Sequence, residues 1–81
     1  MAEHEYSLTD LSSASYLIAV GEQLVRLDFS NPKRVIFYFQ NTPTVRRAVE
    51  EFWNGRARVD PLHLLQTQKL LKQRIYAHQQ P

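Results

Sequence analysis

The side chains with the most versatile chemistry in this sequence are three histidines and one pair of adjacent carboxylates. His63 and His78 are separated by about four turns of the expected last helix, too far to share a metal ion. His4 stands alone near the N-terminus, and an isolated histidine lacks the partners that orient a ligand or a base. Glu50 and Glu51 are neighbours on an expected helix, so they point to different sides and form no acid–base pair.

No common catalytic motif accompanies these side chains. The chain has no cysteine, which excludes a thiolate nucleophile, a disulfide and a sulfur-ligated metal. It contains no G-x-G-x-x-G, no phosphate-loop lysine and no G-x-S-x-G. The two glycines, Gly21 and Gly55, both suit helix ends. We therefore expect a protein that is not an enzyme, with no catalytic residue, cofactor, metal or small-molecule substrate.

The size and composition are those of one small domain. The 81 residues are 43% hydrophobic and 22% charged, ordinary values for a globular protein. The longest apolar run, Val35 to Phe39, is far shorter than the ~20 residues of a membrane helix. The acidic N-terminus has no apolar signal segment. Together with the lack of cysteine, these features predict a soluble, cytoplasmic protein that binds no membrane.

Charge is distributed unevenly, although the net charge is only +2. Residues 1–32 contain one base and five acids, whereas residues 33–81 contain nine bases and three acids. This asymmetry favours an anionic partner for the second half of the chain. It equally fits pairing of the two halves within one molecule or between subunits.

The centre of the chain predicts a β-hairpin. Apolar and polar residues alternate on both sides of a turn-forming segment, and alternate side chains share one face of a strand. Pairing of Phe29 with Val35 makes Ser30–Arg34 a five-residue loop. Helices must cover the apolar face, because an isolated hairpin is marginally stable. The side chains expected to point inward are Val25, Leu27, Phe29, Val35, Phe37 and Phe39.

One helix is expected before the hairpin and two after it. Thr9 and Asp10 are rival N-caps of the first helix, and Gly21 ends it. Thr42 caps the second helix, and Pro43 is its first residue. Apolar residues three and four apart form the buried stripes of these helices: Leu11, Ala14, Leu17 and Ile18 in the first, and Val45, Ala48, Val49, Phe52 and Trp53 in the second.

The last helix carries more apolar residues than one contact face requires. Asp60 is its expected N-cap and Pro61 its first residue, and it is expected to end near Ala77. One face is expected to pack on the domain, through Leu64, Leu71 and Ile75. The surplus suggests a second buried surface, most simply in a homodimer. Together with residues on the outward face of the hairpin, it forms a candidate protein interface: Ile36, Tyr38, Leu62, Leu70 and Tyr76.

These elements predict a small α+β domain of order αββαα, in which a β-hairpin packs against three helices. Residues 7–77 are expected to form the domain. Residues 1–6 and 78–81 are expected to be disordered termini. The sequence leaves open whether a second copy extends the two-stranded sheet.

Two binding functions fit this domain. The first is a non-catalytic interaction module that self-associates or docks onto a larger protein. The second is a nucleic-acid-binding accessory protein whose basic second half contacts phosphates. Its candidate phosphate-binding residues are Arg46, Arg47, Lys69, Lys72 and Arg74. The last three spread over more than half the helix circumference, and bases near a helix C-terminus also favour the helix dipole.

Several motifs resemble those of a family of small bacterial and phage-associated domains of unknown function. They cover most of the chain: Asp10-Leu11, Ala14-x-Tyr16-Leu17, Gly21, Val35 to Phe39, Asn54-Gly55 and Val59-Asp60-Pro61. All are helix caps, helix ends or core positions, so the resemblance implies no catalytic or ligand-binding residue. It implies a short protein with an accessory role near nucleic acid or a partner protein.

Overall fold

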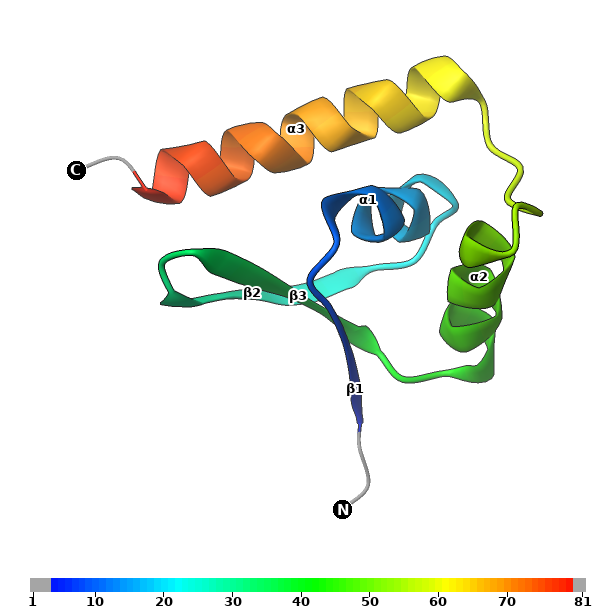
Figure 1. Cartoon of the computed structure of the whole chain (residues 1–81), viewed down its shortest axis with the longest axis horizontal. Coiled ribbons are helices and arrows are strands. Elements are labelled where there is room, and N and C mark those ends of the chain that lie inside the picture. Colours follow the sequence, from blue (N-terminus) through cyan, green and yellow to red (C-terminus); the bar gives the residue numbers. More distant parts are fainter. Residues whose placement is uncertain (1–3, 80–81) are drawn as a thin grey trace.

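The computed structural model describes residues 4–79 and contains a three-stranded sheet and three helices. In chain order the elements are β1 (Glu5–Leu8), α1 (Leu11–Ala19), β2 (Leu24–Asn31), β3 (Arg34–Gln40), α2 (Pro43–Trp53) and α3 (Pro61–Gln79). Helix α1 lies on one face of the sheet, α3 lies over α1, and α2 stands at one end (Figure 1). The α+β class is confirmed, but the order is βαββαα.

Strand β1 was not predicted. It pairs antiparallel with β3, so β3 is the central strand of a sheet of order β1-β3-β2. Tyr6 lies opposite Phe39 and packs against the core. The expected disorder of residues 1–6 is therefore wrong for Glu5 and Tyr6, whereas residues 1–3 lie outside the described part. Strand β1 is hard to predict because its four residues are too few to show a clear alternation of apolar and polar side chains. Its partner strand β3 also lies far along the chain.

The hairpin turn is shorter than predicted. Asn31 pairs with Arg34, so Pro32 and Lys33 form a two-residue turn in place of the five-residue loop. The Asn31 side chain accepts a hydrogen bond of 2.9 Å from the backbone N–H of Lys33. Asparagine favours turns because its side chain bonds the backbone two residues on. With this turn, both strands continue closer to the tip of the hairpin than the predicted five-residue loop would allow.

Strand β2 contains two irregularities that change which side chains point inward. Val25 is an extra residue between the pairs that Leu24 and Arg26 make with β3. Such a bulge interrupts the alternation of faces, so Leu24 packs on the core and Val25 is 46% exposed. The inward prediction is therefore wrong for Val25. A second irregularity, at Phe29 and Ser30, precedes the turn.

Asp28, at the start of the second irregularity, should make the stability of the fold depend on pH, because its carboxylate is hydrogen-bonded to Ser30. The Ser30 hydroxyl and backbone N–H donate to the Asp28 carboxylate and lower its pKa below 3.8, with a smaller contribution from Arg26. A lowered pKa stabilises the fold above the unfolded value, and this stabilisation is lost as the pH falls through the folded value. As the pH falls below about 5, we expect the Asp28→Asn variant to lose less unfolding free energy than the parent chain, measured by urea titration at each pH. Parallel profiles would contradict this.

The core lies between α1, α2 and the inner face of the sheet. Its buried apolar side chains are Ala14, Tyr16, Leu17, Phe37, Phe39, Val45, Ala48, Val49 and Leu71. Ser13 and Ser15 of α1 are also fully buried. Their hydroxyls donate to the backbone carbonyls of Asp10 and Leu11, so burying them leaves no polar group unpaired. Serine, a weak helix former, is therefore tolerated at the centre of the domain.

Asp10, not Thr9, caps α1. Its carboxylate accepts a hydrogen bond of 2.8 Å from the backbone N–H of Ser13. We expect Asp10→Ala to lower the free energy of unfolding by about 1 kcal/mol in urea denaturation, because this N–H loses its partner. Thr9→Ala is the matched control and should change stability by less than about 0.5 kcal/mol. Equal effects would contradict this assignment.

The other predicted helix starts are confirmed, but Trp53 is not buried. Thr42 accepts from the Val45 N–H, and Asp60 accepts from the His63 N–H. Trp53, at the end of α2, is more than half exposed and lies edge-on to Phe52. Its position, about 80° around the helix from Val45, turns it away from the core.

Helix α3 runs past Ala77. The predicted disorder of residues 78–81 is therefore wrong for His78 and Gln79, and the remaining two lie outside the described part. The His78 ring stacks on Phe29 of β2, with ring centroids 3.6 Å apart. This contact joins the end of α3 to the hairpin. The sequence offered no sign of it, because the two residues are distant along the chain.

Candidate interaction surfaces of the last helix

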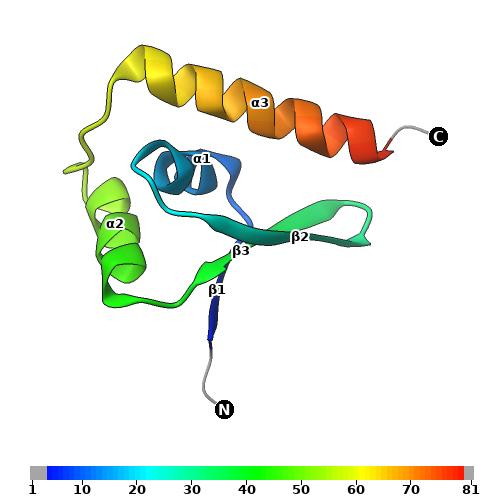
Figure 2. The same ribbon diagram turned by 180° about the vertical axis from the view of Figure 1, so that it is seen from behind.

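Helix α3 is packed on one side only. Leu71 is its buried residue, and the partly buried Leu64 and Ile75 pack on the core beside it. One ring nitrogen of His63 lies 3.2 Å from the Ala19 carbonyl at the end of α1. Beyond α1, the helix continues over the hairpin (Figures 1 and 2). The rest of its circumference is open to other molecules.

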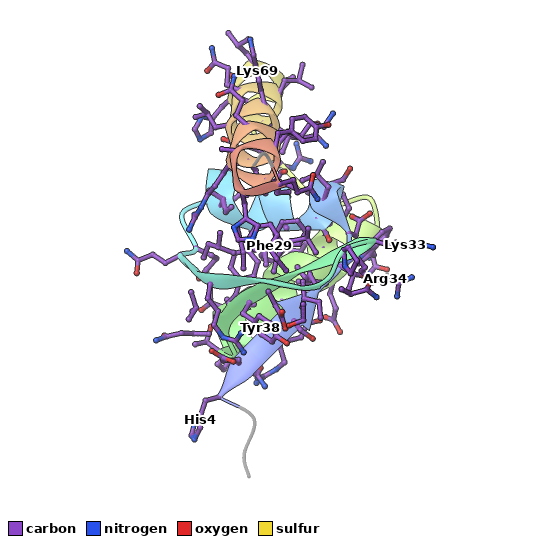
Figure 3. All side chains as sticks on the ribbon, turned by 90° about the vertical axis from the view of Figure 1, so that its left-hand side faces the viewer. His4, Phe29, Lys33, Arg34, Tyr38 and Lys69 are labelled. Carbon is purple, nitrogen blue, oxygen red and sulfur yellow. The ribbon has the colours of Figure 1, made fainter. Side chains whose placement is uncertain are left out.

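The side of α3 that points away from the domain combines apolar and basic residues. We call Leu62, Leu65, Lys69, Lys72 and Tyr76 the outer face. These five residues lie within about 80° of helix circumference. Leu62, Leu65 and Tyr76 are 57–62% exposed, and Lys69 points away from the sheet (Figure 3). Contiguous exposed apolar side chains typically mark an interaction site.

A groove separates α3 from edge strand β2. Its apolar end has a volume of about 260 Å³ and is lined by Ile18, Leu24, Thr67, Leu70, Leu71 and Arg74. Arg74 also lines the next hollow, which follows β2 from Val25 to Phe29 and reaches His78. Together these adjoining hollows form what we call the α3–β2 groove. Figure 3 shows Phe29 on the side of the sheet that faces α3.

The candidate phosphate-binding residues do not form one patch. Lys69 and Lys72 lie together on the outer face, whereas Arg74 lies about 140° around the helix from Lys69 and enters the groove. Arg46 and Arg47 are exposed on α2, at one end of the molecule (Figure 1). The structure therefore divides the five residues into three groups: Lys69 with Lys72, Arg74, and Arg46 with Arg47.

The candidate interface residues also fall on separate surfaces. Leu62 and Tyr76 lie on the outer face, and Leu70 lines the groove. Ile36 and Tyr38 are half-buried, and Tyr38 points from the opposite side of the sheet (Figure 3). The five residues therefore do not form one interface.

Tyr38 is covered by a cluster that sequence reasoning missed. The Arg26 guanidinium carbon lies 3.9 Å from the Tyr38 ring centroid. Two guanidinium nitrogens of Arg26 donate to the Glu5 carboxylate at 3.1 and 3.3 Å. The hydrogen bond to Glu5 is the main cause that raises the pKa of Arg26. This ion pair links both edge strands across β3, so it could be anticipated only by placing β1 in the sheet.

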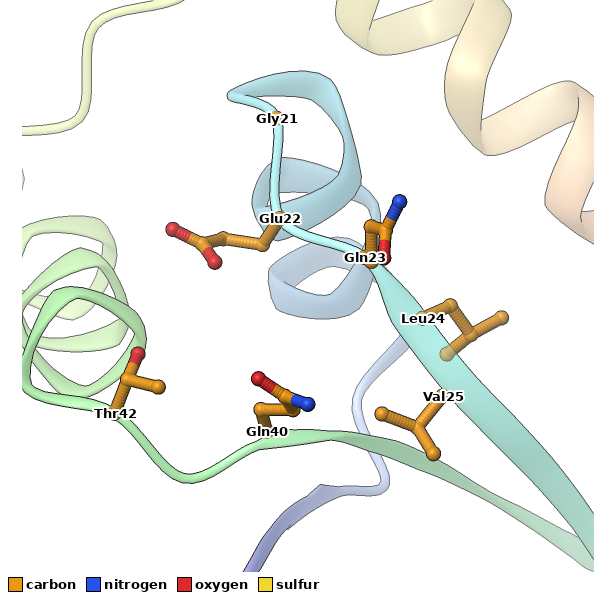
Figure 4. Close-up of a pocket in the computed structure, with 7 residues that line it drawn as sticks. All are labelled: Gly21, Glu22, Gln23, Leu24, Val25, Gln40 and Thr42. Carbon is orange, nitrogen blue, oxygen red and sulfur yellow. The ribbon is translucent and has the colours of Figure 1, made fainter.

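A polar hollow of about 230 Å³ lies between the α1–β2 connection and the start of α2 (Figure 4). Its polar side chains are those of Glu22, Gln23, Gln40 and Thr42. The Thr42 hydroxyl oxygen already accepts the N–H of Val45 as a helix cap. Glu22 is the one ionisable group among the lining residues, so this hollow holds no nucleophile–base pair.

Comparison with known proteins places this small α+β domain in one family. The chain belongs to the family described as a domain of unknown function (DUF5659), whose model matches residues 3–77. This confirms the resemblance to a family of small domains of unknown function. No curated protein and no solved structure matches the chain. Within residues 4–79, no helix has the length and apolarity to cross a membrane, and no group of three or more histidine or carboxylate side chains is placed to hold a metal ion.

Proposed function

We propose that the protein is a non-catalytic cytoplasmic module that binds another polypeptide through α3. The observation that carries this proposal is the outer face, where Leu62, Leu65 and Tyr76 are each more than half exposed. Amphipathic helix faces are a recurrent way for proteins to dock. The bound polypeptide is either a second copy of the chain or a different protein.

The effect of salt on binding distinguishes these two kinds of partner, because it depends on what lies opposite the charge of Lys69. Lys69 lies midway between Leu62 and Tyr76, so an antiparallel pair of outer faces would place two copies of Lys69 side by side. Like charges in an interface weaken association, and salt screens them. In sedimentation experiments, added salt should therefore strengthen a homodimer. It should weaken a complex with an acidic partner.

Site-specific photo-cross-linking in the cells that make the protein tests the proposal. A photoreactive amino acid at Leu65 should give a discrete protein adduct. An adduct of twice the chain mass identifies self-association, and any other mass identifies a partner. The same amino acid at Thr44, exposed on α2, is the control and should give none. Absence of a protein adduct at Leu65 would contradict the proposal, as would an adduct that nuclease removes.

Nucleic-acid binding is the second candidate. It is favoured by the absence of acids between Pro61 and Gln79 and by the exposure of Lys69 and Lys72 on one face. The variant K69Q/K72Q/R74Q should lose salt-sensitive retention on immobilised DNA, because each phosphate contact adds to the salt dependence of binding. R56Q/R58Q, in the exposed connection between α2 and α3, is the control and should be retained. Unchanged retention of the triple variant would contradict this candidate.

A further inference from the structure

We propose that the α3–β2 groove binds an extended segment of a partner polypeptide, with an acidic side chain of that segment on Arg74 and a neighbouring apolar side chain in the pocket beside it. This inference rests on the proposed polypeptide-binding function and assigns it a second, chemically distinct surface. The outer face and the groove lie on different sides of α3, so the two can be tested separately.

The apolar end of the groove suits one side chain of the partner. Ile18, Leu24 and Leu71 form its walls, and its volume is about 260 Å³. Leu70 stands at the rim and is 65% exposed. A bound apolar side chain would remove surface from water on both partners, which is the main favourable contribution to protein association.

Arg74 supplies the charge complementarity. It lies where the apolar pocket meets the hollow along β2, and no acid lines either one. Among residues 4–79 the ion pair found is that of Arg26 with Glu5, so Arg26 is already neutralised and Arg74 has no carboxylate partner. A guanidinium matches a carboxylate with two parallel hydrogen bonds. The partner's side chain on Arg74 is therefore acidic.

The shape of the groove favours an extended segment. The stacked rings of Phe29 and His78, 3.6 Å apart, join the β2 wall of the groove to its α3 wall at the far end. The hollow is lined by Arg26 and Leu27, consecutive residues of β2, so it follows the strand. Strand β2 is an edge strand, and one side of its backbone is free to bond an extended peptide.

A selection from a phage library of random linear peptides, with the full chain as target, tests this inference. The enriched peptides should share an aspartate or glutamate next to a large apolar residue. In fluorescence anisotropy, R74Q should bind the best peptide about tenfold more weakly, the loss expected for one charge-assisted contact. K72Q removes a charge on the outer face and is the matched control, with unchanged affinity.

Four outcomes would overturn the inference. Three are failure to enrich any peptide, a consensus without an acid, and equal affinity of R74Q and the parent chain. The fourth is release of the labelled peptide at the protein concentrations at which the chain dimerises, which would assign the groove to a second copy. Cross-linking at Leu65 does not depend on Arg74. A positive cross-link with a failed selection therefore removes only the groove, whereas loss of the cross-link removes the proposed function.

Discussion

Phe37→Ala is expected to lower the free energy of unfolding by about 3–5 kcal/mol, the usual loss for a buried phenylalanine. The Phe37 side chain is 1% exposed and sits on the central strand β3, opposite Leu8 on one side and Leu27 on the other. Small domains have a total stability of about 5–15 kcal/mol. The variant should therefore lose a large share of its stability, measured by circular dichroism as a lower urea midpoint.

Val25→Ala is the matched control for this substitution. Both positions were expected to point inward, but the bulge in β2 leaves Val25 exposed. We expect this variant to differ from the parent by less than about 0.5 kcal/mol. A Phe37→Ala variant as stable as the parent would show that the inner face of the sheet is assigned wrongly.

Leu71→Ala should have the second-largest effect, a loss of about 2–5 kcal/mol. Leu71 is 5% exposed, and the packing of α3 on the domain is centred on it. Leu70→Ala removes the same atoms from the next residue, which is mostly exposed, and should change stability by less than about 0.5 kcal/mol. Urea unfolding of the two variants compares them directly.

The Leu70→Ala variant also distinguishes an effect on stability from an effect on peptide binding. Leu70→Ala should leave the fold intact and weaken binding of the selected peptide, because Leu70 forms the rim of the apolar pocket. Equal destabilisation by both substitutions would show that α3 does not pack on the domain as described.

The helix starts were predictable because their causes are local. Thr42 with Pro43, and Asp60 with Pro61, each place a capping side chain beside a residue that needs no N–H partner. The rivalry between Thr9 and Asp10 is resolved by one hydrogen bond to Ser13. That bond lies within one turn of the helix. The sequence alone does not choose between Thr9 and Asp10, because both side chains can accept such a bond and only the backbone geometry decides which one does.

The candidate surfaces were predictable in part. The surplus of apolar residues in the last helix is visible in the sequence, and Leu62, Leu70 and Tyr76 are indeed exposed. Their division between the outer face and the groove was not visible, because it depends on where α1 and β2 lie. The Arg26–Glu5 pair was missed for the same reason, since it requires strand β1.

The amino-acid sequence by itself determined the α+β class, the three helices and the aromatic central strand, because caps and periodic patterns act over a few residues. Only the tertiary structure decided the register of β2, the pairing of β1 and the side of α3 that is covered. These features depend on contacts between residues distant along the chain, such as Phe29 with His78. An extra residue such as Val25 changes the inward face of a strand without changing the pattern that identifies it.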